Sequence, residues 1–525
     1  MNRKATIAAC VLALILGLIV LFLPKSRELS FLETEITEDR WNEITSTHIK
    51  NPFLSLSGIT FDGYELQLDS DGGRYFYSII QNSDTAYNPM IYFPKESRIN
   101  IATLKPDLSY ESVAENQSIK LLLYTSVDYR IVDLVATTLP IMNIDTKWHP
   151  NISDKDSQAA ISLFDNSEFV NQRIVKSDTN IHLRGSTSYF QEKKSYKLNL
   201  TLPDGSNNRL RLLGMRKDDD WILNSLYGDF EKVRNILAAQ MWKDCCSEHN
   251  EMQAPNSFEY RFVELFVDNS YVGLYLLGYK PDKKVVNLNS SEYIYKYKDW
   301  ANAEILRSDD NFFRYFDYEK GDAPEEDVRE ELLSSIDVIS SGSIDDIKNR
   351  YDIDNIIDIE LHGMITQNVD YIKDNKVKNL YITMKNTPTR RVVLYTPWDF
   401  DLAFGNSWKD GLENNTSTVS YGSPIDTVIE SDQFPTSALR RLGDKSITEA
   451  EKKRYAELRR GAWSNEHIFS LIDKYESEIF DSGAYYRDEA RWPKGNYLED
   501  VNDLSVFKEY MKKRLEFVDA YYDYK

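Results

Sequence analysis

The amino-acid sequence predicts an α+β protein, and three patterns along the chain support this fold class. Short segments of alternating polar and apolar residues fill residues 52–137, strands and helices are mixed over 138–435, and the pattern of 436–525 is mainly helical. Alternation with a period of two indicates strands, whereas apolar residues three or four positions apart indicate helices. A chain of 525 residues is long enough for roughly two to four domains.

The start of the chain, residues 1–27, is predicted to be a transmembrane signal anchor. Residues 5–23 are nineteen uncharged residues, close to the roughly 20 that span the hydrocarbon core of a bilayer. Two basic residues precede this segment, and no A-x-A-like cleavage site follows it. We expect a single-pass protein of the cell membrane whose soluble part is extracytoplasmic, although Lys25 and Arg27 nearly balance the basic residues before the segment.

The composition is that of an acidic globular protein. Hydrophobic residues make up 42% of the chain, which is ample for a large core, and the formal net charge is −21. Binding to nucleic acid needs clustered lysine and arginine side chains that neutralise phosphates. The charge therefore argues against a nucleic-acid partner and favours solubility and attraction for cations.

The cysteine pattern and the absence of several short motifs argue against other classes of protein. One of the three cysteines lies in the apolar segment and the other two, Cys245 and Cys246, are adjacent, so no disulfide framework is expected. The sequence contains no H-E-x-x-H, paired C-x-x-C, G-x-S-x-G or P-loop motif. Zinc hydrolases, serine hydrolases and P-loop proteins therefore lack their usual support.

Two segments separate the anchor from the central part of the chain. Residues 28–51 are polar and are expected to be a linker. In residues 52–137, the alternation at Tyr64, Leu66 and Leu68 is followed by a turn rich in aspartate and glycine and by further short strands. Strands of this length between Gly, Asp and Pro turns are typical of a β-sandwich. We predict a small β-sandwich-like domain that acts as a spacer or recognition module.

Residues 138–435 are predicted to form the core that carries the chemistry. In the strand at 194–200, Tyr196 and Leu198 share one face and Lys197 lies on the other. Lys197 is therefore expected to point away from the apolar side of its strand.

Two hairpins and two helices are expected in the same core. A long hairpin is predicted over 258–279 and a shorter one over 380–395. Apolar residues at helical spacing predict one helix after an N-cap at Asp229 and another that starts near Asn355. Residues 436–525 are predicted to be the helical C-terminal part of this domain.

Four polar residues around the shorter hairpin form the candidate site: Asp370 in a loop, Asn379 at the start of a strand, and Asp399 and Asp401 after the hairpin. Antiparallel pairing brings the two ends of a hairpin together, so Asn379 and Asp399 are expected to lie close to one another. A phosphoryl-transfer site needs oxygen ligands for a divalent metal ion and a group that aims a hydroxyl. The order of these residues matches that need.

The same residues have structural alternatives. A loop aspartate such as Asp370 is commonly a turn former or a cap. Asp401 faces the same way as Asp399 in an extended chain, so it is either a second metal ligand or the cap of the following segment. Trp398 and Phe400 are expected to be packing anchors rather than substrate contacts.

An earlier segment offers groups for phosphate. Arg184 and the hydroxyl-bearing turn that contains Ser188 lead by a short loop to the strand of Lys197. A guanidinium, a hydroxyl and an ammonium can receive phosphate oxygens. The alternative is a basic, solvated hairpin.

Several segments in a fixed order resemble the CotH family, the spore-coat protein H type of atypical bacterial kinase. They cover residues 139–405, with a looser helical match to the end of the chain, and read LPIMNIDT, HLRGSTS with KKSYKLNL, a helix with Arg234-Asn235, VELFVDNSYVGLYLL, KNLYITM and TPWDFDLAFG. The resemblance implies an atypical protein-kinase-like fold that uses ATP with Mg²⁺ or Mn²⁺. It also implies phosphorylation of Ser or Thr in exported, spore-coat or cell-surface proteins.

The resemblance implies a role for each candidate residue. Lys197 matches the family's nucleotide lysine, Arg184 and Ser188 lie near phosphate, and Asp370 matches the catalytic aspartate. Asn379 and Asp399 match the metal ligands, and Asp401 is a further candidate ligand.

The chain departs from the expected pattern in two ways, and other functions stay open. The interval from Asp370 to Asn379 contains three lysines and is longer than in ordinary protein kinases. After VGLYLL the family usually continues with Thr-Glu, whereas this chain has Gly278, Tyr279 and Lys280, so a carboxylate of the nucleotide site is missing. One alternative is a non-catalytic coat or cell-surface assembly protein that kept the fold and works by binding. Another is phosphate transfer to a polysaccharide or a lipid head group.

Overall fold

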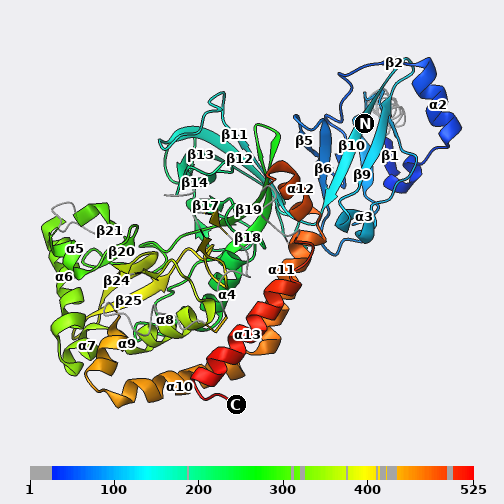
Figure 1. Ribbon diagram of the computed structural model, residues 1–525. Coiled ribbons are helices and arrows are strands. Elements are labelled where there is room, and N and C mark those ends of the chain that lie inside the picture. Colours follow the sequence, from blue (N-terminus) through cyan, green and yellow to red (C-terminus); the bar gives the residue numbers. More distant parts are fainter. Residues whose placement is uncertain are drawn as a thin grey trace, which may run out of the picture.

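The computed structural model describes residues 27–168, 170–185, 189–308, 312–319, 325–373, 376–409, 412–413, 421–422, 434–493 and 501–525. The apolar segment at 5–23 and Ser188 therefore lie outside the described residues. Within the described ranges, no helix is both long and apolar enough to cross a membrane. Figure 1 shows strands gathered in three places, with helices of the C-terminal part running beside them.

The N-terminal part consists of two sheets that share one core. One sheet has the order β1 (Arg27–Ser30), β7 (Met90–Phe93), β3 (Thr60–Phe61), β4 (Tyr64–Glu65). The other has the order β5 (Gln67–Asp69), β6 (Arg74–Ser78), β10 (Asp128–Thr137), β9 (Ser118–Tyr124), β8 (Asn100–Ala102), and β2 (Ile49–Lys50) also pairs with β10. Phe61 and Ile91 of the first sheet pack in one hydrophobic cluster with Tyr77, Leu121 and Leu134 of the second.

The segment predicted as a linker, 28–51, is instead part of this fold. It holds β1, the 3₁₀ helix η1 (Phe31–Thr34), α2 (Glu38–Thr47) and β2, and β1 pairs antiparallel with β7 over its whole length. The reason is burial, because Phe31 is 0% exposed and belongs to the shared core. A short helix, α3 (Tyr110–Ala114), completes the helices described in this part.

Seven strands close into a barrel in the centre of the molecule. Their order is β11 (Ile141–Asp145), β12 (Ser157–Phe164), β13 (Ile174–Arg184), β14 (Ser195–Thr201), β17 (Asp220–Asn224), β19 (Ser270–Gly278), β18 (Tyr260–Val267). In β14, Tyr196 and Leu198 are buried and Lys197 is partly exposed, as the alternation predicts. The predicted long hairpin is confirmed as β18 and β19. A two-stranded ribbon, β15 (Leu210–Arg211) and β16 (Lys217–Asp218), accompanies the barrel.

A second sheet lies next to the barrel and has helices packed around it (Figure 1). Its order is β21 (Phe316–Glu319), β20 (Tyr293–Tyr297), β24 (Leu380–Asn386), β25 (Arg391–Pro397), and the last two strands confirm the predicted shorter hairpin. The helices are α4 (Arg234–Cys245), α5 (Ala303–Ser308), α6 (Glu325–Ser341), α7 (Ile344–Arg350) and α8 (Ile353–Thr366). The side chain of Asp352 caps α8 by accepting a hydrogen bond from the amide of Asn355, so this helix starts close to its predicted position.

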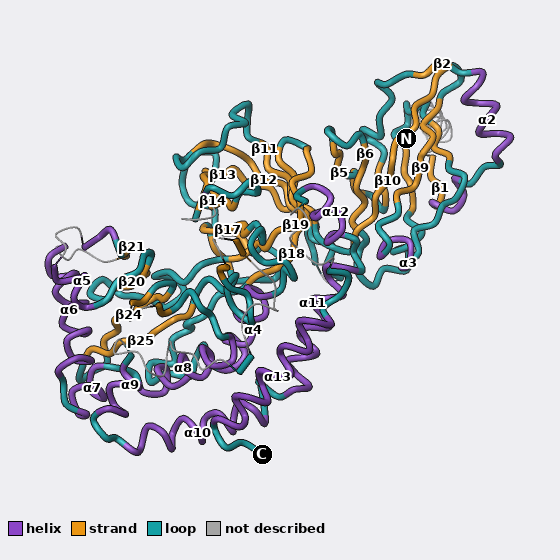
Figure 2. Tube along the Cα trace, viewed as in Figure 1, coloured by secondary structure: helices purple, strands orange, loops and turns teal. Residues whose placement is uncertain are grey.

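The C-terminal part is helical, as predicted for 436–525. It contains α9 (Pro435–Arg441), α10 (Lys445–Arg460), α11 (Asn465–Phe480), α12 (Ala484–Arg491) and α13 (Ser505–Tyr521). Figure 2 shows these helices as a continuous band from the second sheet up to the barrel. At its upper end, Arg487 of α12 contacts Glu264 of the barrel and donates a 2.7 Å hydrogen bond to Asn116 of the N-terminal part. The band therefore connects all three β-rich parts.

Candidate functional site

The candidate residues meet in one cleft between the barrel and the second sheet. Its volume is about 660 Å³, within the usual range for a small-molecule site. The cleft is lined by six of the seven residues singled out from the sequence: Arg184, Lys197, Asp370, Asn379, Asp399 and Asp401. The seventh, Ser188, lies outside the described residues. The structure thus brings together side chains that are far apart along the chain.

Asp370 and Asn379 are joined directly. The side-chain amide of Asn379 donates a 2.7 Å hydrogen bond to Oδ2 of Asp370, and the ammonium of Lys378 lies 3.0 Å from the same oxygen. Both Asp370 and Asn379 are buried. Burial raises the pKa of Asp370, while the positive charge of Lys378 opposes this shift. A carboxylate whose pKa is raised is better matched to accepting a proton near neutral pH.

The two ends of the hairpin carry an unusual backbone conformation. Leu380 pairs with Pro397 in the β24–β25 register, so Asn379 and Asp399 emerge at the same end of the hairpin. Both have positive φ angles, 56° for Asn379 and 65° for Asp399. For residues other than glycine this region costs free energy, and such strain concentrates at functional sites.

The loop that follows the hairpin is held by buried side chains. Asn235 of α4 accepts a 2.9 Å hydrogen bond from the amide of Phe400, and Tyr371 accepts one of 3.2 Å from the amide of Trp398. Trp398 is 2% exposed and Phe400 is 0% exposed, so both pack in the core as expected. The guanidinium of Arg184 lies 5.9 Å from the ring centre of Trp398, which links the barrel to this loop.

Two further residues complete the support: Asn368, which sequence reasoning missed, and Arg234, which it noted only as part of a family motif. Asn368 donates a 2.7 Å hydrogen bond to the carbonyl of Asp399 and accepts one from the amide of Asp370, so it fixes both candidate residues together. Arg234 donates a 2.9 Å hydrogen bond to the carbonyl of Ala403. Asn368 resembles an ordinary residue after a helix end, and only the three-dimensional contacts reveal its position.

The predicted cap at Asp229 is wrong. The helix α4 begins at Arg234 with Val233 as its N-cap. Asp229 instead accepts a 2.8 Å hydrogen bond from the amide of Arg234 and forms a buried ion pair with its guanidinium, together with Glu231. A charged group that is fully buried requires such partners, and this requirement outweighs the local capping preference.

The donor set fits a hard divalent cation. The carboxylate of Asp399 accepts no hydrogen bond within the described ranges, and the amide oxygen of Asn379 accepts none either. These oxygens therefore keep their lone pairs, and Asp401 adds a further carboxylate to the same cleft. Carboxylate and amide oxygens are the ligands that Mg²⁺ and Mn²⁺ prefer.

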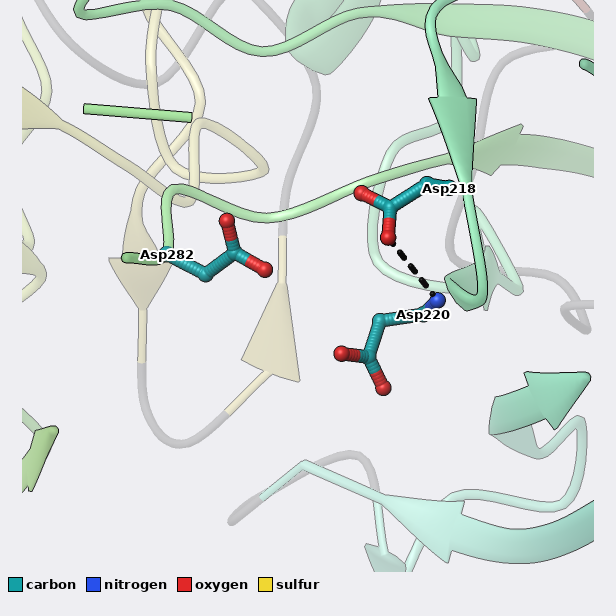
Figure 3. A group of neighbouring side chains, drawn as sticks. All are labelled: Asp218, Asp220 and Asp282. Carbon is teal, nitrogen blue, oxygen red and sulfur yellow. Dashed lines mark hydrogen bonds between the residues drawn. The ribbon is translucent and has the colours of Figure 1, made fainter. Parts of the chain in front are cut away.

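A separate acidic cluster is already paired with cationic side chains of the protein. Asp218, Asp220 and Asp282 have carboxylate oxygens within 4.8 Å of one another (Figure 3). The ammonium of Lys284 lies 2.8 Å from Asp220 and 3.5 Å from Asp282, and it also contacts Asp218. The cluster is the counter-ion of a lysine. Asp220 also lies 3.9 Å from the ammonium of Lys197, so the cluster helps to hold Lys197 at the cleft.

Cationic side chains form much of the cleft wall. Besides Arg184 and Lys197, the cleft is lined by Lys280, Lys296, Lys298, Arg314 and Lys378. The chain as a whole has a net charge of −21, so this gathering is local and favours a polyanionic ligand. The alternation of Lys296 and Lys298 with buried Tyr295 and Tyr297 places both lysines on the polar face of their strand. It does not by itself show that this face lines a cleft.

The residue that departs from the family pattern faces away from the cleft. Tyr279 is 4% exposed and is not among the lining residues. Its hydroxyl donates a 3.1 Å hydrogen bond to Glu259, and its ring lies edge-on to Trp221. The next residues, Lys280 and Pro281, are the ones that reach the cleft.

The fold and the cleft define a mixed α+β protein with a cation-walled site that is rich in oxygen ligands. A sequence profile described as CotH kinase protein matches residues 181–518, which is more than half of the chain and contains the cleft. The chain therefore belongs to the CotH kinase protein family. No curated protein matches the chain.

Proposed function

We propose that the chain is an atypical protein kinase that transfers the terminal phosphoryl group of ATP to Ser or Thr side chains of exported, spore-coat or cell-surface proteins. The observation that supports this most directly is the meeting of Asp370, Asn379 and Asp399 in one cleft that several lysine and arginine side chains also line. Membership in the CotH kinase protein family points in the same direction. The proposed location is extracytoplasmic, with residues 5–23 as the membrane anchor.

In this proposal Asp370 acts on the acceptor hydroxyl. The hydroxyl oxygen forms a bond to the terminal phosphorus of ATP while the bond to the bridging oxygen breaks and ADP leaves. The hydroxyl proton passes to the carboxylate of Asp370. The bonds from Asn379 and Lys378 to Oδ2 of Asp370 fix the orientation of the carboxylate and leave its other oxygen for the acceptor.

The phosphate chain is held from both sides of the cleft. Asn379 and Asp399, with Asp401, are the proposed ligands for Mg²⁺ or Mn²⁺. These oxygens would hold the ion, and the ion would supply positive charge against the phosphate oxygens. Lys197 and Arg184 of the barrel pair with phosphate oxygens from the other side, since guanidinium and ammonium groups bind these oxygens strongly.

The test uses the purified chain with γ-labelled ATP, Mn²⁺ and a mixture of Ser- and Thr-containing acceptor proteins. We expect label on the acceptor, and we expect D370N and D399A to lower the rate by roughly 100-fold or more, the usual contribution of a positioned proton acceptor. Equal transfer by the parent chain and both variants would refute catalysis.

A binding assay distinguishes an active kinase from a non-catalytic protein that only binds nucleotide. ATP with Mn²⁺ raises the melting temperature only if the site is formed. A chain that is stabilised by nucleotide but transfers no label is a nucleotide-binding, non-catalytic assembly protein. Label found on a polysaccharide or lipid instead of a protein identifies a different acceptor class.

A further inference from the structure

One lysine of the cleft, Lys296, lacks an ionic partner among the residues that the structure describes. Lys296 lies on β20, where it pairs with Tyr381 of β24 and with Asp317 of β21 through the backbone. It lines the cleft, and its ammonium makes no hydrogen bond or ion pair with any residue in the described ranges. Tyr381 is two residues beyond Asn379, so Lys296 belongs to the strand beside the candidate metal ligands.

Three other lysines of the cleft have carboxylate partners. Lys298 lies 2.9 Å from Asp317, Lys378 lies 3.0 Å from Asp370, and Lys197 lies 3.9 Å from Asp220. Lys296 differs from these three because no carboxylate in the described part of the chain is paired with it.

The surroundings of Lys296 make an unpaired ammonium unfavourable. Burial lowers its pKa to about 8, and the guanidinium of Arg184 acts in the same direction. The carboxylate of Asp399 opposes this shift, so Lys296 is near enough to Asp399 to feel its charge. A partly buried cation without a partner is costly, and a ligand that brings negative charge to this position removes that cost.

We propose that Lys296 is a phosphate-binding residue that receives the terminal phosphate of the nucleotide from the second sheet, while Lys197 approaches from the barrel. This assignment rests on the proposed kinase function. The terminal phosphate is the natural partner because it carries charge next to the proposed metal ligand Asp399. ATP then supplies a direct ionic partner for Lys296, which no residue in the described ranges provides.

The experiment compares three variants of the full chain by calorimetric titration with Mn²⁺–ATP and with Mn²⁺–ADP. Losing one charge-assisted contact should lower the ATP affinity of K296M about tenfold or more. The affinity for ADP, which lacks the terminal phosphate, should change much less, and K296R should keep most of the ATP affinity. The control is K513M, because Lys513 is a partly exposed lysine of α13 paired with Glu509, and its ATP affinity should equal that of the parent chain.

The melting temperature of each variant without nucleotide distinguishes a loss of binding from a loss of folding. Because K296M removes an unpaired charge from a partly buried position, its melting temperature without nucleotide should equal or exceed that of the parent chain. If K296M fails to fold, K296Q replaces it in the titrations. A parent chain that binds ATP, together with a Lys296 variant of equal affinity, overturns the assignment and leaves the kinase proposal standing. A parent chain that binds neither nucleotide overturns both.

Discussion

Asn379 and Asp399 stand at the two ends of one β-hairpin, and both have left-handed backbone conformations, with φ angles of 56° and 65°. Asparagine and aspartate adopt this region more readily than other non-glycine residues. They also carry the oxygen atoms that a divalent cation needs. The same two residues thus meet a backbone requirement and a chemical one, which explains why they occur at these ends.

Because of the backbone strain at Asp399, we expect two substitutions of this residue to differ in stability although both abolish activity. Glycine tolerates positive φ, whereas alanine costs about 1 kcal/mol or more there. We expect D399G to unfold at a higher temperature than D399A, while both lose phosphoryl transfer. Thermal melts and the labelled-ATP assay measure the two effects.

The control for this comparison is Asp133, a partly exposed residue inside β10. Glycine weakens a strand interior, so D133G should be less stable than D133A, the opposite order. An identical order at both positions would mean that backbone strain at Asp399 is unimportant.

The contact from Asn235 predicts an effect on metal binding. Its side chain accepts the hydrogen bond from the amide of Phe400, directly after Asp399. Removing this acceptor leaves a buried amide unsatisfied and costs about 1–3 kcal/mol. N235A should therefore require a higher Mn²⁺ concentration for half-maximal transfer, measured by metal titration at saturating ATP.

A comparable buried amide elsewhere provides the control. Asn250 bonds its own loop through Ala254, away from the cleft lining. N250A should lower the melting temperature without changing the Mn²⁺ requirement. If both variants shift the metal requirement equally, Asn235 acts only through general stability.

Much of the local structure could be predicted because it depends on short patterns in the sequence. The alternation around Lys197, the two hairpins and the helix that starts near Asn355 all depend on neighbouring residues. The closed barrel was not predictable in this way, because it depends on the parallel pairing of Ile141 with Glu264. No local signal reports a pairing between residues so far apart.

The candidate site was predictable in part for the same reason. Asp370, Asn379 and Asp399 lie close to one hairpin, so their order along the chain was informative. Lys296 looks like a polar position on a solvent-exposed strand face, and only the neighbouring barrel turns that face into a cleft wall. The opposite error occurred at Phe31, because the mostly polar segment 28–51 suggested a linker although Phe31 is fully buried.

The buried carboxylate of Asp488 predicts a pH-dependent contribution to stability. It lies 2.6 Å from the ammonium of Lys193 and 2.9 Å from that of Lys232. Burial opposes its ionisation, but the two ammonium groups outweigh this effect and lower its pKa to about 2. Breaking a buried ion pair costs about 3–5 kcal/mol, so D488N should be strongly destabilised at pH 7.

The sign of the pH effect follows from the lowered pKa. Asp488 binds its proton less readily in the folded state than in the unfolded chain, so its stabilisation is fully present above about pH 4 and is lost as the pH falls towards 2. The difference in melting temperature between the parent chain and D488N should be constant from pH 5 to 7 and shrink below pH 4. D473N, at a residue whose side chain is 64% exposed, should show almost no difference.

The position of Tyr279 predicts that the departure from the family pattern leaves nucleotide binding intact. Its hydroxyl bonds Glu259, which also pairs with Lys243 at 2.7 Å, and its side chain does not line the cleft. Y279F should therefore lower stability by about 1 kcal/mol, the usual worth of one hydrogen bond, and keep the affinity for Mn²⁺–ATP. Since phenylalanine preserves the packing of the ring against Trp221, a loss of affinity in a normally folded Y279F would show that the hydroxyl itself reaches the nucleotide.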